Sequence, residues 1–581
     1  MNLLGWAEII LSIGLAVGLA WPIGDHIGRI WLGEPTRLDR YLSPIEHGFY
    51  RLAGVDPDRG QNWWRYAFSL LAFNAAGFAL LYLMLRLQGV LPLNPQRAPG
   101  MAPDLAFNAA VGFVTNTDWP AYAGERAVSH LVQMAGFTTQ MFASAGSAMA
   151  VAAAFARAFR SRGRVNIGNF WADLVRNTLY VLAPLSIVVA IVLLALGVPQ
   201  TLQGEIGAQT LEGAHQAIAL GPIASQEAIK QLGTNGAGFF SANAAHPFEN
   251  PSPLTNLIEM AAMNAVGFGC AIAFGRVVRA RSDARALVIV MAMTLGAAAA
   301  AIYAAETGPT PAMAAAKLQP AANLEGKEQR FGAPGTAVFI AMTTGSSDGA
   351  VNDVQDSLTP AGSGVALFMI LLGHTLPGGV GSGIYNMLVM ALLAVFLAGM
   401  LVGRTPEYLG KKIEAREVKL AMLSALIVSV TILGLSAASA ILPQALSSLS
   451  VKGPHGLMEI FYAYASATSN NGSSFAGLRV DTAYWNTTLG LAMLIGKFGT
   501  TIPVLAITGS LAAKPKLAHT DGTFPTDGPL FVGLITAVIV ILTGLQYFPA
   551  LALGPIVEQS QMQARVAVEQ GAWFSAPPPA P

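Results

Sequence analysis

The sequence predicts an all-α membrane protein with about ten transmembrane helices, arranged as a fourfold repeat of helix, pore half-helix, filter and helix around a central pore. The first reason is composition. Of the 581 residues, 53% are hydrophobic and only 11% are charged, against about 25% charged residues in a typical soluble domain. The second reason is a set of long apolar stretches, and the third is a series of regularly spaced polar runs. Such a chain lacks the polar surface that several soluble domains need.

Charge and cysteine content exclude two further classes. The 33 Lys and Arg residues balance 32 Asp and Glu residues, for a net charge of +1, whereas a nucleic-acid-binding chain needs a basic face. The single cysteine, Cys270, can form neither an internal disulfide nor a thiolate metal cluster. We therefore expect no nucleic-acid partner.

Ten apolar stretches are long enough to cross a bilayer, which takes about 20 residues of helix. They cover residues 3–23, 65–88, 130–158, 173–197, 255–277, 285–305, 365–400, 418–442, 485–510 and 528–550. The first stretch differs from a secretory signal, which opens with positive charge, because residues 1–20 hold no Lys or Arg and include Glu8. We expect it to remain as a helix.

The distribution of basic residues predicts the orientation of the spans. Lys and Arg are about twice as frequent in one set of connecting segments as in the other, and the richer set is expected to face the cytoplasm. This set includes residues 157–164, 276–285 and 404–419. Both termini are therefore predicted to lie outside. The basic inner segments are expected to set topology and to contact anionic membrane lipid, and docking of a partner is the alternative.

Four shorter apolar stretches lie in the segments predicted to be outside, and each is too short to span. They cover residues 104–114, 225–232, 335–342 and 457–467. Each is followed at once by a run rich in Thr, Ser, Asn and Gly. These runs contain Asn116, Gly236, Gly349 and Gly472, roughly 120 residues apart. The spacing predicts four units, each with an outward helix, a re-entrant half-helix, a polar strand and an inward helix.

This repeat divides the chain into six parts. Residues 1–60 form the first transmembrane helix and a cytoplasmic linker, and residues 516–581 form the last transmembrane helix and an outer tail. The four pore repeats cover residues 61–165, 166–280, 281–416 and 417–515.

Polar runs at membrane depth predict a cation pathway. Non-helical backbone is tolerated at membrane depth only where it is buried in protein or lines a water-filled cavity. Glycine lets successive carbonyls turn toward one axis, where they can replace the hydration shell of a cation. The half-helices would direct their negative C-terminal ends at the same ion. Uncharged oxygen ligands favour a monovalent ion such as K⁺. The alternative is that the runs are ordinary turns between spans, which does not account for four runs in register behind half-helices.

At these runs the sequence resembles the A subunit of the Kdp-type potassium-transporting P-type ATPases, KdpA, within the superfamily of potassium transporters. The resemblance extends from end to end and is carried by residues 112–119, 225–236, 344–352 and 464–477. It implies a channel-like subunit whose selectivity filter has glycines at Gly236, Gly349 and Gly472 and none in the first repeat. The filter residues it implies are Val114, Thr115, Asn116, Thr117, Thr234, Asn235, Gly236, Ser347, Asp348, Gly349, Asn470, Asn471 and Gly472.

Two positions depart from the family pattern. Ala237 stands where a further glycine is usual, and His374 stands where a glutamate is common. A hydrogen-bonded structural role is the simpler interpretation of His374, because histidine at such a place is more often structural than an ion ligand.

The seventh apolar stretch is interrupted by Pro377 and five glycines, a composition that breaks a helix. A kink or a connector is one interpretation. The resemblance implies a gate below the third filter run, and its residues would be Gly378, Gly379, Gly381 and Gly383.

Lys497 is the one Lys or Arg that lies in a predicted span away from its ends. An intramembrane charge marks a functional site by default, here a fixed positive charge that would keep cations from leaking through the pore. The alternative is that its side chain snorkels to the inner face.

The chain contains no motif for ATP hydrolysis. It lacks a phosphate-binding loop and the Asp-Lys-Thr-Gly motif of P-type pumps, so we expect K⁺ as the transported ion and no nucleotide bound by this chain. The resemblance implies a catalytic subunit, KdpB, and the small single-span subunits KdpC and KdpF, in a bacterial plasma (inner) membrane. It implies a non-catalytic, potassium-binding and translocating subunit of an ATP-driven high-affinity import complex.

Two other classes stay open. A passive or ion-gradient-driven potassium transporter would act without an ATPase partner, although such proteins typically lack the extra first and last spans. A membrane enzyme or scaffold would need acid, base or metal-ligand side chains clustered at one depth, and the 8 His residues are scattered.

Overall fold

The computed structural model describes residues 1–310, 313–314, 316–318, 320–372, 375–518 and 524–564. Within these residues, 10 helices are long and apolar enough to cross a membrane, as the fold class predicts. They are α1 (Leu3–Leu32), α3 (Trp63–Leu87), η1 (Val132–Thr138) continued by α6 (Thr139–Arg160), α7 (Phe170–Asn177) continued by η2 (Thr178–Leu182) and α8 (Ala183–Ala195), α10 (Pro253–Val278), α11 (Arg281–Glu306), α15 (Ser382–Val402), α16 (Ala415–Ser439), α19 (Ala483–Ala513), and α20 (Pro529–Leu551) with η5 (Ala552–Ile556).

The shorter elements lie between these spans. The four predicted half-helices are α4 (Pro103–Thr115), α9 (Ile223–Gly233), α13 (Gly332–Gly345) and α18 (Pro454–Thr468). The other helices are α2 (Asp39–Ala53), α5 (Gly124–Ala127), η3 (Asn243–Ala245), η4 (Gln355–Ser357), α14 (Pro360–Leu372) and α17 (Pro443–Leu446). Two small antiparallel hairpins pair β1 (Glu205–Gln209) with β2 (His215–Ala219) and β3 (Glu407–Tyr408) with β4 (Lys411–Lys412).

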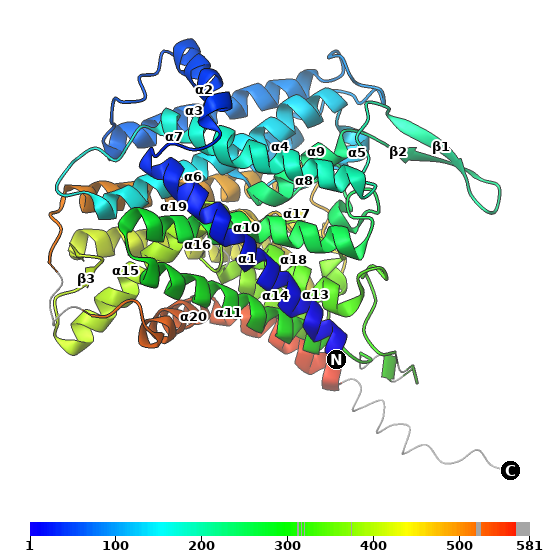
Figure 1. Ribbon diagram of the computed structural model, residues 1–581. Coiled ribbons are helices and arrows are strands. Elements are labelled where there is room, and N and C mark those ends of the chain that lie inside the picture. The colour runs from blue at the N-terminus through cyan, green and yellow to red at the C-terminus, as the bar shows by residue number, and fades with distance from the viewer. Residues whose placement is uncertain (311–312, 315, 319, 373–374, 519–523, 565–581) are drawn as a thin grey trace.

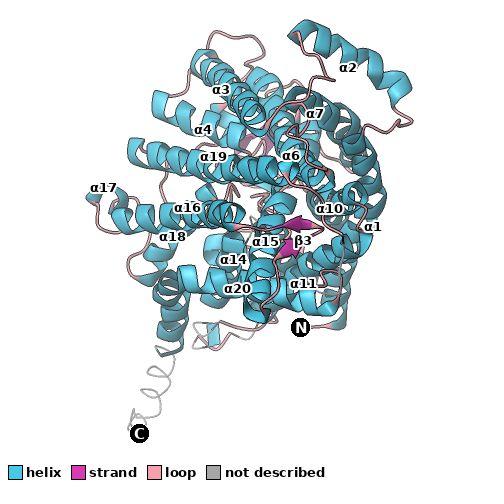
Figure 2. Cartoon of the chain, turned by 90° about the vertical axis from the view of Figure 1, so that its left-hand side faces the viewer, coloured by secondary structure: helices cyan, strands magenta, loops and turns pink. Residues whose placement is uncertain are grey.

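The long helices run side by side, and the two ends of the bundle differ (Figure 1). The N-terminus and the end of the last described helix lie at one end, from which the β1–β2 hairpin projects. Helix α2 and the β3 strand lie at the opposite end, where Figure 2 shows α2 standing out beyond the bundle. An even number of spans returns the chain to the side from which it starts.

The first span is longer than predicted. The sequence predicts a helix over residues 3–23, whereas α1 continues to Leu32 and ends at Gly33, which has a φ of 70°. The reason is close packing on α10. A Cβ atom on Gly24 would lie 2.6 Å from the carbonyl oxygen of Gly269, and one on Gly28 would lie 2.6 Å from Cδ of Arg276. Small residues let the two helix backbones approach, so the partner helix extends α1 beyond its most apolar part.

The predicted span over 365–400 is two helices in the structure. Helix α14 ends at Leu372 and α15 begins at Ser382, and only α15 has the length of a span among the described helices of this stretch. The break falls at Pro377 and its neighbouring glycines, as their composition predicts. His374 lies outside the described residues.

Candidate functional site

Each of the four half-helices ends inside the protein and is followed by a buried polar run. The backbone turns at each end through a residue in the left-handed region. These residues are Asn116, Thr234, Ser347 and Asn470, with φ of 64°, 50°, 52° and 51°. None is glycine, so each must be held there by its surroundings, because side chains disfavour this region.

A shared backbone hydrogen bond sets the register of the four runs. The amide that follows the left-handed residue donates to a carbonyl in the last helical turn. The four bonds are Thr117 N to Gly112 O at 2.9 Å, Asn235 N to Lys230 O at 2.9 Å, Asp348 N to Thr343 O at 3.1 Å and Asn471 N to Ser466 O at 2.9 Å. The positions that follow are therefore equivalent: Asp118, Gly236, Gly349 and Gly472.

This register corrects one reference point of the sequence analysis. The predicted spacing is counted from Asn116, whereas the backbone places Asp118 at the position of the three glycines. Asp118 also has a positive φ, of 50°. The only signal in the sequence is that Asp118 directly follows Thr117. The sequence does not show where α4 ends, so it does not determine which residue of this run is equivalent to glycine.

The four runs meet at one point. A Cβ atom on Gly236 would lie 2.6 Å from the carbonyl oxygen of Thr117 and 3.0 Å from Cα of Gly472. One on Gly349 would lie 2.8 Å from Cα of Gly236. Gly349 and Gly472 have φ of 92° and 109°. All three glycines are required for space, because any side chain would meet the backbone of a neighbouring run. Gly349 and Gly472 are also required for their left-handed backbone conformation.

Side-chain amides tie the runs to one another. Asn116 Nδ2 donates to the carbonyl of Gly233 at 3.2 Å. Asn470 Nδ2 donates to Thr117 Oγ1 at 2.8 Å, and Asn471 Nδ2 donates to the carbonyl of Thr343 at 2.9 Å. The first run is thus tied to the second and the fourth, and the fourth to the third.

The remaining residues predicted for this site lie in the same place. Val114 and Thr115 form the last turn of α4 and are buried. The hydroxyls of Thr115 and Thr117 are 2.7 Å apart. The amides of Gly349 and Gly472 donate to the hydroxyls of Thr343 and Ser466, both at 3.0 Å. The structure therefore brings all thirteen predicted positions to the ends of the four half-helices.

Several buried oxygens at this junction have no hydrogen-bond donor in the part of the chain that the structure describes. They include both carboxylate oxygens of Asp118, Oδ2 of Asp348 and Oδ1 of Asn470. Buried polar atoms are almost always partnered by protein, water or an ion. Carboxylate, amide and backbone oxygens are also the donors that hard cations prefer. The donor set therefore fits a cation, and no thiolate or imidazole is among these atoms.

The glycine-rich break between α14 and α15 packs directly against the runs. Gly378 N donates to the carbonyl of Gly345 at 2.9 Å, and Val380 N donates to Thr234 Oγ1 at 3.0 Å. Gly381 has a φ of 75°, and a Cβ atom there would lie 2.5 Å from the backbone of Ala148 in α6. The segment is held between the ends of two half-helices and a span.

A narrow cavity separates the runs from this break. It is lined by Asn116, Ser347 and Asn470 from the runs, by Gly379 and Ser382 from the break, and by Lys497 from α19. The Lys497 side chain is 8% exposed. No hydrogen bond or ion pair to its Nζ is found among the described residues, and the residue lines this cavity.

A second buried lysine, Lys230, lies on α9 in a segment predicted to be outside, and the sequence predicts no site role for it. It is fully buried and forms ion pairs with Glu227 at 2.5 Å and Glu249 at 2.8 Å. Its Nζ also donates to Asn243 Oδ1 at 2.7 Å, and Asn243 Nδ2 donates to the carbonyl of Gly236 at 2.6 Å. The available sequence signal was the i, i+3 spacing of Glu227 and Lys230.

A cluster of titratable side chains lies away from the runs. Asp356, His455 and Glu459 have ligand atoms within 4.8 Å of one another, which would suit a metal. However, both nitrogens of His455 are already occupied, by Asp356 at 3.0 Å and Glu558 at 2.9 Å. These hydrogen bonds raise the pKa of His455 to about 10. The cluster is therefore an ion-paired contact between α18 and the last helix.

Comparison with known families decides what this arrangement belongs to. The sequence model of KdpA, the potassium-transporting ATPase A subunit, matches residues 10–560. The chain belongs to the KdpA family. Curated relatives share this assignment over nearly their whole length. A protein of Beijerinckia indica called a potassium-transporting ATPase potassium-binding subunit is 61% identical over 97% of this chain and 99% of its own. A protein of Caulobacter sp. with the same name is 58% identical over 98% of this chain and 100% of its own.

A solved structure shows the same fold. The potassium transporter TrkH of Vibrio parahaemolyticus superposes with a TM-score of 0.51, covering 86% of this chain and 97% of TrkH. At 13% sequence identity this likeness concerns architecture alone. It agrees with the predicted all-α membrane fold of the KdpA family member described here.

Proposed function

We propose that this chain is the potassium-binding, selective and translocating channel-like subunit of an ATP-driven, high-affinity potassium import complex. One observation carries the proposal: four polar runs, three of them with a glycine at the equivalent position, meet at one buried point behind four half-helices. Family membership supports it, because the family consists of A subunits of potassium-transporting ATPases. Curated relatives are named potassium-binding subunits.

At the junction, K⁺ would exchange its water for oxygens of the four runs. Backbone carbonyls, the hydroxyls of threonine and serine and the amides of asparagine hold a monovalent cation by dipoles, so the ion can leave again. Asp118 adds a carboxylate where the other repeats have glycine. It makes the ring unequal, and we assign it a contribution to ion attraction that the sequence analysis did not include.

The path below the junction runs into the cavity between the runs and the break. We assign Gly378, Gly379, Gly381 and Gly383 to a constriction there, because this segment is bonded to Gly345 and Thr234 directly under the filter. The uncompensated charge of Lys497 on the cavity wall would raise the energy of a cation that moves on through the pore. An ion that reaches this cavity is then directed sideways toward a partner subunit.

The energy source lies in another chain. We assign that role to a catalytic P-type ATPase subunit, KdpB, with KdpC and KdpF as small companions, because the chain has no phosphate-binding loop or phosphorylation motif. K⁺ is the transported ion, and we assign no nucleotide to this chain. We place the complex in the bacterial inner membrane with both termini of this chain outside, so that the filter faces the medium and basic segments face the cytoplasm.

The filter glycines provide the test. Gly349→Ala introduces a Cβ atom that would meet the Asn471 and Gly236 backbones, so we expect the potassium concentration for half-maximal ATPase activation of the complex to rise about tenfold or more, which corresponds to about 1.4 kcal/mol. Gly236→Asp should act in the same direction. Gly434→Ala is the matched control, because nothing lies within 4 Å of a Cβ atom there. Unchanged values for both filter variants would show that the filter is misplaced.

A further inference from the structure

Helix α2, between the first two spans, directs polar groups toward the protein and large apolar side chains away from it, the reverse of a surface helix in a soluble protein. Its polar residue Glu46 and its neighbour Tyr50 face the protein, and each is only 5% exposed. Leu42 is partly buried against the core, but four other large apolar side chains of this helix face outward. They are Tyr41, Ile45, Phe49 and Leu52, which are 68%, 48%, 50% and 88% exposed. Their spacing of four, four and three residues places them on one face of the helix.

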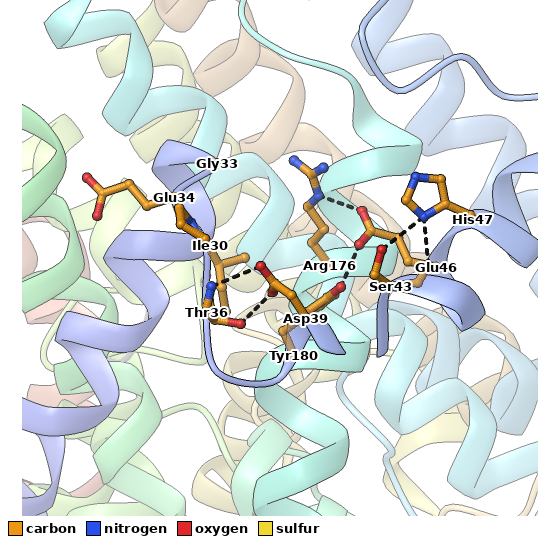
Figure 3. A pocket seen from close by; sticks show the side chains of 11 residues that line it. Ile30, Gly33, Glu34, Thr36, Asp39, Ser43, Glu46, His47, Arg176 and Tyr180 are labelled. Carbon is orange, nitrogen blue, oxygen red and sulfur yellow. Dashed lines mark hydrogen bonds and ion pairs between the residues drawn. The ribbon is translucent and has the colours of Figure 1, made fainter. Parts of the chain in front are cut away.

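The inward face is fixed by a buried carboxylate (Figure 3). Glu46 accepts hydrogen bonds from Arg176 Nε at 2.7 Å, Tyr180 Oη at 2.7 Å and Tyr50 Oη at 2.8 Å. Burial alone would raise the pKa of Glu46, but these hydrogen bonds outweigh it and lower the pKa. The ionised Glu46 therefore anchors α2 to the α7–η2 helix, and α2 cannot roll its apolar face inward without breaking this anchor.

The apolar face needs a non-aqueous neighbour. Each fully exposed large apolar side chain costs about 1.5–3 kcal/mol relative to burial, and no described part of the chain covers these four. In Figure 1, α2 lies across the direction of the long helices, at their end. In Figure 2, it stands at the rim of the bundle. A helix so placed in a membrane protein lies along the bilayer surface, with its outward face toward lipid.

The exposed side chains of α2 that carry a charge at neutral pH are Arg40 and Arg51. Arg40, His47 and Arg51 are exposed and recur at i, i+7 and i+11, which places them in one stripe beside the apolar face. Asp39 is engaged at the helix start, where its carboxylate accepts from Thr36 N and Oγ1 at 3.0 and 2.6 Å. The exposed acids Asp56 and Asp58 lie beyond the end of the helix. A basic stripe beside an apolar face matches an anionic lipid surface, whereas a protein partner's transmembrane helix would offer the arginines no anion.

We propose that α2 is an interfacial anchor that binds anionic phospholipid. Tyr41, Ile45, Phe49 and Leu52 enter the acyl boundary, and Arg40 and Arg51 bind the phosphates of the same leaflet. An arginine near an anionic surface is worth about 1 kcal/mol, or roughly fivefold in partition. The assignment rests on the membrane fold and not on the proposed transport function.

The test places a spin label at Ile45→Cys in the full chain, purified with its accompanying subunits and reconstituted in nanodiscs. Cys270 is fully buried, and Cys270→Ala removes the only other thiol of this chain. Leu211→Cys, at a side chain fully exposed near the tip of the β1–β2 hairpin, is the matched control. Collisions with lipid-soluble oxygen and with a water-soluble nickel chelate are compared in phosphatidylcholine and in an equal mixture with phosphatidylglycerol.

In the phosphatidylglycerol mixture we expect the label at Ile45 to favour oxygen and the label at Leu211 to favour the nickel chelate. In phosphatidylcholine, or with Arg40→Gln and Arg51→Gln together, nickel access at Ile45 should rise several-fold. Equal access in both lipids would overturn the assignment to anionic lipid. Protection that is lost when the chain is prepared without its companions in the same mixture would overturn it in favour of a protein partner. No step uses potassium or ATP, so this result is independent of the proposed function.

Discussion

Lys230 and Lys497 are both buried in the membrane-embedded part of the protein, but their surroundings are opposite. Lys230 is fully buried and is held between Glu227 and Glu249 at 2.5 and 2.8 Å. Lys497 lines the cavity below the four runs, and the described part of the chain offers its Nζ no ion pair. The charge of Lys230 is balanced by two ion-paired carboxylates, whereas the charge of Lys497 has no ion-paired carboxylate among the described residues.

The contrast separates two uses of buried charge. A buried pair is costly to break and contributes little net stability over an apolar pair, so its value at Lys230 lies in geometry. The lysine holds Asn243, and Asn243 holds the carbonyl of Gly236. A single charge without an ion-pair partner does not hold neighbouring groups in place, but it changes the energy of another charge about 10 Å away where the dielectric constant is low. Lys230 therefore shapes the junction of the runs, and in the proposed pathway Lys497 would act on a cation that passes it.

Replacing Lys230 should produce the largest effect. Lys230→Met leaves Glu227 and Glu249 buried without a cation, and breaking such a pair costs about 3–5 kcal/mol. We expect a lower thermal unfolding temperature and a lower yield of folded chain. The triple variant that adds Glu227→Gln and Glu249→Gln should recover part of the loss, because the two carboxylates that pair with Lys230 are then uncharged. A single variant as stable as the native chain would contradict the assigned pairing.

Replacing Lys497 should leave stability nearly unchanged but alter ion flow. Lys497→Met leaves no paired carboxylate behind, and loss of a unit charge acting over about 10 Å is worth about 1–2 kcal/mol. We therefore expect ATP-independent potassium leak into vesicles to rise about tenfold. Lys497→Arg keeps the charge and should leak no more than the native complex. Equal leak in the Met variant and the native complex would show that the charge does not face the ion path.

His455 extends the comparison to a paired cation that titrates, and its effect should be the smallest. The pKa of His455 is raised from 6.5 to about 10 by Asp356 and Glu558. The native state therefore retains a proton that the unfolded chain loses above pH 6.5, so the stabilisation is complete below pH 6.5 and disappears as the pH rises through about 10. The unfolding temperature of the native chain should fall more across this interval than that of His455→Gln. Parallel profiles would remove His455 as the cause.

Much of the fold could be predicted because its signals are local. Apolar stretches define spans wherever lipid is the solvent, and a short apolar stretch before a Thr-, Asn- and Gly-rich run defines a half-helix. The interruption at Pro377 is equally local, since proline and glycine break a helix whatever surrounds them. Accordingly the four half-helices, the break and eight of the ten spans lie close to their predicted positions, whereas the first span is longer than predicted and the seventh is shorter and begins after the break.

The remaining features depend on contacts between distant segments. The sequence does not show that Asp118 is equivalent to the three glycines, because the register depends on where α4 ends. It does not show that Glu249 reaches Lys230, or that Glu46 meets Arg176, 130 residues away. The extension of α1 likewise depends on its packing against α10. The role of the thirteen run residues as potassium ligands remains the proposal made above.

The most direct test of the proposed potassium filter is to locate the ion. The complex would be purified in K⁺ and in Rb⁺, a heavier congener, and the density on the axis between Thr117, Gly236, Gly349 and Gly472 compared. We expect a peak at this junction, within about 3 Å of backbone oxygens, that strengthens in Rb⁺ and is lost in Gly349→Ala. An empty junction in both salts, with the cation bound elsewhere in the membrane-embedded part, would contradict the proposed filter.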